Sequence, residues 1–208
     1  MDSISIFAVD VGSTKNFAWV SDAGLRGTDG NSLAAAIKSA LAADRRVALG
    51  FECPLFIPVP LKWVGIGKAR VGEGNRSWSA GGGATVATYG LHQVAWTLAR
   101  LRAAASAATP IFFSPESWLL SDEPGLLIWE AFVTGSDKGR NHADDAQRAC
   151  RAFEQLLKRK AWDEARQVTV GDEAQSLNLA ALAAEWAGWP VTPDDPKSQV
   201  LVVKPLKT

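Results

Sequence analysis

The 208-residue sequence has few cysteines, no net charge and no long hydrophobic run, and each absence excludes a class of protein. Its two cysteines, Cys53 and Cys150, are too few for a disulfide framework and cannot alone complete a four-ligand zinc site. The 22 basic and 22 acidic side chains give a net charge of zero. This balance argues against a strongly basic nucleic-acid coat protein or a polybasic membrane binder, although it does not exclude a local basic patch.

No apolar run reaches the roughly 18 residues that a membrane span needs, and no basic region followed by an apolar stretch opens the sequence. We therefore expect a cytoplasmic protein without membrane contact. Apolar residues make up 47% of the chain, which predicts a sizeable core, and the length fits a single domain over residues 1–208. The nine tryptophans are interpreted as core and interface residues, which makes a homodimer plausible.

Short apolar runs alternate with helical patterns, and this alternation is typical of an α/β protein. Strands are expected at residues 4–11, 17–20, 47–52, 110–113, 126–133, 167–170 and 199–203. Helices are expected at residues 32–43, 84–107, 142–158 and 173–186, the first capped by Asn31 or Ser32. Because residues 12–16 join the first two strands tightly, we predict an antiparallel hairpin followed by parallel strands, in a mixed sheet with helices on both faces.

The segment 54–83 is the least regular part of the sequence, with repeated prolines and glycines. We expect a long loop here, and loops of this length are usually functional or mobile. Four of its five charged side chains are basic: Lys62, Lys68, Arg70 and Arg76, against Glu73. The glycine-flanked Arg76 is suited to approach an anion, although a loop arginine can equally be solvent-exposed.

Carboxylates lie on three of the expected strands: Asp10, Glu52 and Glu130. An ionised carboxylate without a partner costs several kcal/mol to bury, so three of them suggest a shared partner, of which a divalent cation is the simplest. Two structural alternatives remain open. Asp10 could accept hydrogen bonds from the following turn, and Glu130 could pair with Arg76 or Lys15 and stabilise the fold alone.

The helix expected from His142 carries further candidates. Its apolar stripe consists of Ala146, Cys150, Phe153 and Leu157, which we expect to face the sheet. At about 100° per residue, His142 lies about 40° from this stripe, Asp145 about 100° and Asp144 about 160°. His142 and Asp145 can therefore face the strand ends, whereas Asp144 points to solvent in a capping arrangement with Asn141.

Two-metal hydrolysis of a phosphodiester uses such a set: carboxylates hold two hard cations about 4 Å apart, one activating water and the other stabilising the leaving oxygen. Magnesium and manganese both suit oxygen ligands, and manganese tolerates an imidazole more readily. The sequence thus predicts a Mg²⁺- or Mn²⁺-dependent nuclease or phosphohydrolase. Asp10, Glu52 and Asp145 would hold the metal, assisted by His142 or Glu130. Lys15 and Arg76 would contact the phosphate of a nucleic acid or a small phosphoester.

The sequence resembles the ribonuclease H-like superfamily in three segments, at residues 9–13, 50–52 and 142–146. Within this superfamily, it is similar to the Holliday-junction resolvases of the RuvC type. This resemblance implies a metal-binding set of Asp10, Glu52, His142 and Asp145. A second resemblance, to the DUF429-like families of the same fold, covers about three quarters of the chain. It is carried by Glu52-Cys53-Pro54-Leu55, Asn75-Arg76, Glu130-Ala131-Phe132 and Asp144-Asp145-Ala146. The neutral charge departs from the basic surfaces of resolvases.

Two other function classes stay open at this point. One is a non-catalytic binding module that keeps the fold and binds a ligand through residues 54–83. The other is an actin-like phosphotransferase, because residues 10–14 also resemble the first hairpin of that group. Those enzymes place two such domains around a nucleotide, and this chain has the length of one.

Overall fold

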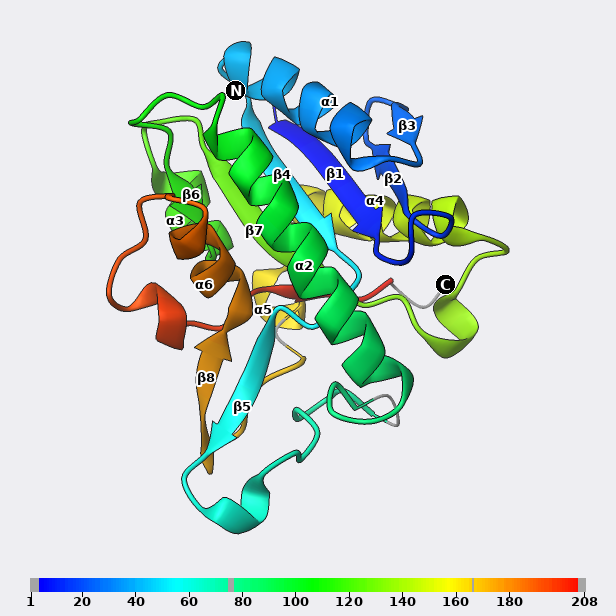
Figure 1. Ribbon diagram of the computed structural model, residues 1–208, viewed down its shortest axis with the longest axis vertical. Helices are drawn as coiled ribbons and strands as arrows, with labels where there is room; N and C mark the ends of the chain where they lie inside the picture. The colour runs from blue at the N-terminus through cyan, green and yellow to red at the C-terminus, as the bar shows by residue number, and fades with distance from the viewer. Residues whose placement is uncertain (1–3, 75–76, 166, 206–208) are drawn as a thin grey trace.

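The computed structural model describes residues 4–74, 77–165 and 167–205, and its centre is a seven-stranded mixed sheet (Figure 1). Its strands are β1 (Ile4–Asp10), β2 (Ala18–Ser21), β3 (Arg26–Gly27), β4 (Arg46–Phe51), β6 (Ile111–Phe112), β7 (Leu126–Ala131) and β9 (Val202–Val203). Their order is β3-β2-β1-β4-β7-β6, and β9 also pairs with β7. β2 pairs antiparallel with both β1 and β3, whereas β4, β7, β6 and β9 join by parallel pairing. The predicted hairpin and the α/β class are confirmed.

Helices cover both faces of this sheet, as the sequence predicts. On one face α1 (Gly30–Ala42), α2 (Gly82–Arg102) and α6 (Leu179–Trp186) share a core with Phe7 and Val9 of β1. On the other face α4 (His142–Arg159) packs against Ile6 and Ala8. Alternate β1 residues thus point to opposite sides, as in any strand buried on both faces. Figure 1 shows α1 and α2 in front of the sheet and α4 behind it.

Two helix starts test the capping predictions. α1 is capped by Asp29, whose side chain accepts a hydrogen bond from the Ser32 amide, so the proposed Asn31 or Ser32 cap is wrong. α4 begins as predicted: Asn141 accepts a hydrogen bond from the Asp144 amide. Two short helices, α3 (Pro115–Leu120) and α5 (Trp162–Ala165), were not expected from the sequence.

The segment 54–83 is more regular than its composition indicates. Residues Phe56–Pro60 form β5, which pairs antiparallel with β8 (Ala174–Asn178), and a 3-10 turn, η1, follows over Trp63–Gly65. β5 has a single partner strand, and this edge position accommodates its prolines. Because residues 174–178 pair with β5, the helix expected over 173–186 begins only at Leu179. The strand expected at 167–170 is reduced to one bridge, between Thr169 and Val71.

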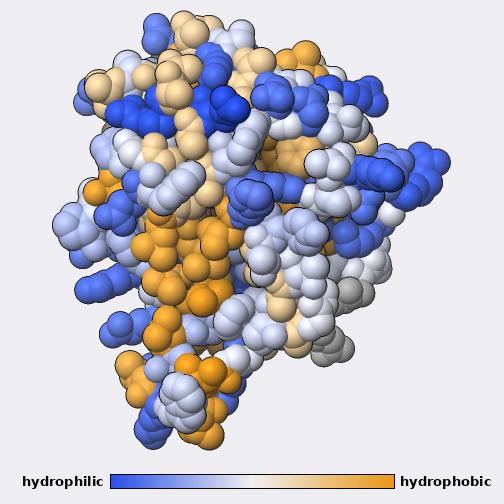
Figure 2. Space-filling model, in the orientation of Figure 1, coloured by the Kyte–Doolittle hydropathy of each residue, from blue (hydrophilic) through white to orange (hydrophobic). Residues whose placement is uncertain are grey.

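The β5–β8 ribbon projects from the sheet and ends in an apolar surface. Trp63 is 86% exposed and Val64 81%, and Leu61 and Ile66 are exposed beside them. Figure 2 shows hydrophobic residues gathered at this lower end of the molecule. None of the helices in the described ranges is both long and apolar enough to cross a membrane.

Candidate metal centre

Three carboxylates meet where β1, β4 and α4 approach one another. Asp10 ends β1, and Glu52 directly follows β4, whose backbone continues the pairing through a 2.8 Å hydrogen bond from the Glu52 amide to the Val9 carbonyl. Asp145 lies in the first turn of α4. One oxygen from each carboxylate lies within 4.8 Å of the others. The structure therefore brings together three of the residues expected to bind metal.

The helical phase of α4 decides which of its two acids joins this group. Asp145 is buried, whereas Asp144 is half-buried and accepts hydrogen bonds from the backbone and side chain of Arg140. The apolar stripe that fixed this phase is as expected: Ala146, Cys150 and Phe153 are buried and Leu157 is half-buried. The sequence-based choice of Asp145 over Asp144 thus agrees with the geometry.

His142 also reaches the strand ends, although it touches only one of the three acids. Its Nδ1 lies 2.5 Å from Oδ2 of Asp10, a hydrogen bond in which the imidazole donates to the carboxylate. The His142 side chain is 47% exposed, so it approaches Asp10 from the solvent side. This contact orients Asp10 and leaves Nε2 of the same ring available to solvent.

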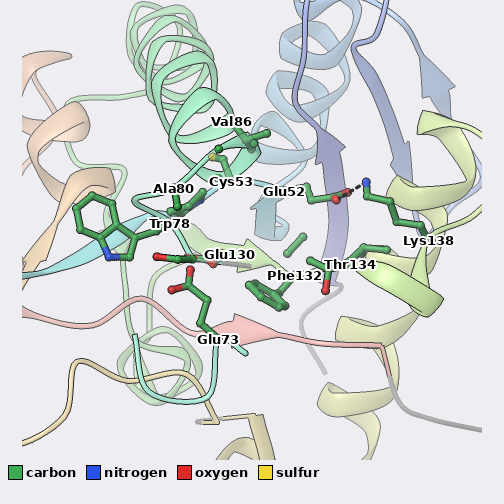
Figure 3. A pocket seen from close by; sticks show the side chains of 17 residues that line it. Glu52, Cys53, Glu73, Trp78, Ala80, Val86, Glu130, Phe132, Thr134 and Lys138 are labelled. Atoms are coloured by element: carbon green, nitrogen blue, oxygen red, sulfur yellow. Dashed lines mark hydrogen bonds and ion pairs between the residues drawn. The ribbon is translucent and has the colours of Figure 1, made fainter. Parts of the chain in front are cut away.

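Lys138 is the site residue that the sequence interpretation missed. It follows the 3-10 turn η2 (Gly135–Asp137), and its Nζ lies 3.0 Å from Oε1 of Glu52 (Figure 3). The same Nζ lies 3.0 Å from Oδ2 of Asp145. The neighbouring Gly139 amide donates to Oδ1 of Asp145 at 2.5 Å. A Cβ on Gly139 would lie 2.3 Å from that of Asp144, so this close approach requires glycine. The available signal was the charged run directly before α4.

Burial and mutual repulsion govern the electrostatics of the three acids. Burial, reinforced by the charge of Asp10, raises the pKa of Glu52 to about 8. Burial likewise raises the pKa of Asp10, against the lowering effect of its hydrogen bond to His142. Burial alone would lower the pKa of Lys138, but Glu52 and Asp145 more than offset it and the pKa is raised. Three carboxylates thus share one ammonium group.

One oxygen of this group has no partner. Oε2 of Glu52 is buried and accepts no hydrogen bond from the described residues. A buried carboxylate oxygen without a donor is costly, and beside further carboxylates it is a suitable ligand for a hard cation. The donor set therefore fits Mg²⁺ or Mn²⁺, which favour oxygen ligands.

Glu130 is buried as expected, but it belongs to a different cluster. Arg70 donates to both of its oxygens at 2.7 Å, and the Leu55 amide donates at 2.9 Å. The same guanidinium bonds to Glu73 at 3.0 Å. Arg70 thus neutralises Glu130, and Glu130 does not belong to the group of three carboxylates. Its partner among the described residues is Arg70 and not Lys15; Arg76, the other basic residue considered from the sequence, lies outside them.

The two expected phosphate contacts receive no support from the geometry. Lys15 is exposed in the turn between β1 and β2, and it takes no part in the contacts of the three carboxylates. Arg76 lies outside the described residues. Lys138 is the basic side chain that the structure places at the site.

A cleft of about 450 Å³ opens beside Glu52, one of the three carboxylates. Glu52 and Lys138 lie at one end, and Trp78 lies at the other (Figure 3). Val86 of α2 and Phe132 line it between these ends, together with the glycines that begin α2. The cleft leads from solvent to Glu52 and to the Lys138 ammonium group.

The arrangement can hold a hard cation and an anionic group side by side. The carboxylates supply oxygen ligands, and the half-exposed ammonium of Lys138 can donate to an anion in the cleft. No protein-family model, no curated protein and no solved structure matches this chain. The assignment of the site therefore depends on its own geometry.

Proposed function

We propose that the protein is a Mg²⁺- or Mn²⁺-dependent nuclease or phosphohydrolase of the ribonuclease H-like type, which hydrolyses a phosphodiester. One observation carries this proposal. Asp10, Glu52 and Asp145 meet at the carboxyl ends of two parallel strands and the start of a helix, and a buried oxygen of Glu52 has no partner. Open α/β sheets bind their ligands at this edge.

The topology supports the ribonuclease H-like part of the proposal. An antiparallel hairpin is followed by parallel strands in the order β2-β1-β4-β7, with the first acid ending β1. This order places the acids of the resembling sequence segments at one edge of the sheet. The resemblance noted in the sequence and the arrangement of strands thus agree.

Each residue of the site has a part in the proposed reaction. A divalent ion bound there would supply a water of lowered pKa and stabilise charge on the phosphate oxygens. Asp10, Glu52 and Asp145 would hold it. His142 fixes the orientation of Asp10 through its 2.5 Å contact. The cleft beside Glu52 receives the part of the substrate that adjoins the scissile phosphate.

A non-catalytic binding module is the second candidate, and one observation favours it. The β5–β8 ribbon ends in exposed apolar side chains, with Trp63 86% and Val64 81% exposed. Such an apolar surface is typical of a site that contacts another molecule. This candidate predicts binding through the ribbon and no hydrolysis.

Hydrolysis assays with Mn²⁺ on branched, duplex and single-stranded DNA and RNA, and on a small phosphodiester, test the proposal. We expect turnover that chelation abolishes. Asp10→Asn should reduce it by at least about 100-fold, the scale on which loss of one transition-state contact acts. The matched control Asp144→Asn removes a neighbouring acid that contacts Arg140 and none of the three carboxylates, and it should leave turnover within about twofold. Full activity in Asp10→Asn, or turnover unaffected by chelation, would contradict the proposal.

A further inference from the structure

The charges at the site set how many divalent ions it can hold. Asp10, Glu52 and Asp145 carry three negative charges when ionised, and Lys138 supplies one positive charge among them. The remainder is two negative charges, which one divalent ion neutralises. A second divalent ion would leave an excess of positive charge in a partly buried place, which is unfavourable.

The hydrogen bonds show that the Lys138 ammonium already occupies the position between Glu52 and Asp145. Lys138 Nζ lies 3.0 Å from Glu52 and 3.0 Å from Asp145, so the ammonium stands between these two carboxylates. The other oxygen of Asp145 accepts the Gly139 amide. Both oxygens of Asp145 therefore have donors from the chain, and this side of the site is satisfied without a metal.

The side of the site formed by Glu52 and Asp10 lacks a donor from the described residues for one buried oxygen. Oε2 of Glu52 is buried and receives no hydrogen bond from the described residues. Asp10 is the neighbouring acid, and its contact with His142 uses Oδ2, which leaves Oδ1 as a ligand. A cation between Asp10 and Glu52 would relieve their repulsion and satisfy the buried oxygen. Two carboxylates completed by water are a common coordination set for Mg²⁺.

We propose that the site holds one divalent ion, between Asp10 and Glu52, and that the Lys138 ammonium takes the place of a second ion between Glu52 and Asp145. This inference depends on the proposed function. It replaces the two-ion arrangement expected from the sequence, and it assigns Asp145 to Lys138 and Gly139 instead of to the ion.

Lys138 also has the means to contact the substrate. An ammonium group has three donors, and Glu52 and Asp145 take two of them. The side chain is 45% exposed and lines the cleft, so the third donor can reach a phosphate oxygen placed there. Lys138 would thus be a catalytic residue that stabilises negative charge on the phosphate as the ester bond breaks. This is the part that a second metal ion plays in two-metal enzymes.

Calorimetric titration of the full chain with Mn²⁺ tests the inference directly. We expect one ion per chain in the wild type and a second, weaker one in Lys138→Gln, because the substitution vacates the place between Glu52 and Asp145 and lowers the excess positive charge that a second ion would leave from two to one. Arg140→Gln is the matched control: it removes a cation two residues away, which contacts Asp144 outside the site, and should still bind one ion. Two ions in the wild type, or one ion of unchanged affinity in Lys138→Gln, would overturn the inference and leave the proposed function standing. No bound ion in any of these proteins would overturn both.

A second pair of variants decides the question even if Lys138→Gln does not fold. Asp10→Asn should weaken Mn²⁺ binding by at least about tenfold, whereas Asp145→Asn should weaken it by less than about threefold, because Lys138 and not the metal contacts Asp145. Equal losses in the two variants would place the metal among all three carboxylates and contradict the assignment.

Discussion

Two clusters of buried carboxylates lie near the ends of neighbouring strands of the sheet, and the chain neutralises them differently. Near the end of β7, Arg70 donates to Glu130 and Glu73 in four side-chain hydrogen bonds of 2.7–3.2 Å. After β4, three carboxylates share the single ammonium of Lys138, and one oxygen of Glu52 has no partner among the described residues. The first cluster is complete, and the second is one cation short.

The difference teaches that an acid on an apolar strand does not by itself indicate a ligand. Glu130 lies on β7 and Glu52 directly follows the adjacent strand β4, whose last residue, Phe51, pairs with Glu130. A guanidinium supplies five donors in a fixed plane, enough to satisfy two carboxylates, whereas an ammonium supplies three. Whether a buried acid is neutralised within the protein or left available to bind a cation therefore depends on the partner that a distant segment provides.

Replacing Arg70 with methionine is expected to have the largest effect, because it leaves Glu73 and Glu130 buried without a cation. Breaking a buried pair by removing one partner costs about 3–5 kcal/mol. We expect the free energy of unfolding, measured by urea denaturation, to fall by this amount in Arg70→Met.

The matched control is Arg140→Met, which removes an exposed i,i+4 partner of Asp144 and should cost less than about 0.5 kcal/mol. Glu73→Gln is a milder variant that keeps the Arg70–Glu130 pair. If the free energy of unfolding of Arg70→Met fell by less than about 1 kcal/mol, this cluster would not be a major stabilising contact between segment 54–83 and β7.

The stability contributed by the cluster of Asp10, Glu52 and Asp145 should respond to pH in the opposite sense to that of an ordinary acid pair. Burial raises the pKa of Glu52 from 4.5 to about 8, so between these values the folded protein keeps a proton that the unfolded chain loses. Without divalent ions, stability should therefore fall as pH rises from about 5 to 8, by at most about 1.4 kcal/mol per pH unit. Mn²⁺ should restore more stability at pH 8 than at pH 5.5, because it replaces that proton.

Thermal unfolding at several pH values, with and without Mn²⁺, measures this effect. Glu52→Gln should flatten the pH dependence over the same range, whereas Glu130→Gln should not, because Glu130 does not belong to the cluster of Asp10, Glu52 and Asp145. A wild-type protein whose stability rises steadily over this range would contradict the assigned environment of Glu52.

The sequence predicted the acids of the site because local rules place them. Asp10 and Glu52 end apolar strands, and Asn141 with the apolar stripe fixes the phase of α4, which selects Asp145. Parallel pairing of β1 and β4 then brings the strand ends to one edge. These features depend on residues close together in the chain, or on the common topology of α/β sheets.

The cations that pair with Glu130 and Glu52 could not be predicted, because they come from far along the chain. Arg70 is 60 residues from Glu130, and Lys138 is 86 residues from Glu52. The same limit explains why the helix expected from residue 173 begins too early. Pairing with β5 holds residues 174–178 in an extended strand, and the Asn178 cap marks where α6 begins. Propensity is a weak guide where a distant strand competes.

One measurement tests the central claim that the cluster of Asp10, Glu52 and Asp145 is a metal site and the Arg70 cluster is structural. Mn²⁺ binding should be measured by calorimetry for the wild type, Asp10→Asn and Glu130→Gln. The account predicts binding to the wild type and to Glu130→Gln with similar affinity, and its loss in Asp10→Asn. Binding that is lost in Glu130→Gln but kept in Asp10→Asn, or that is absent from the wild type, would contradict it.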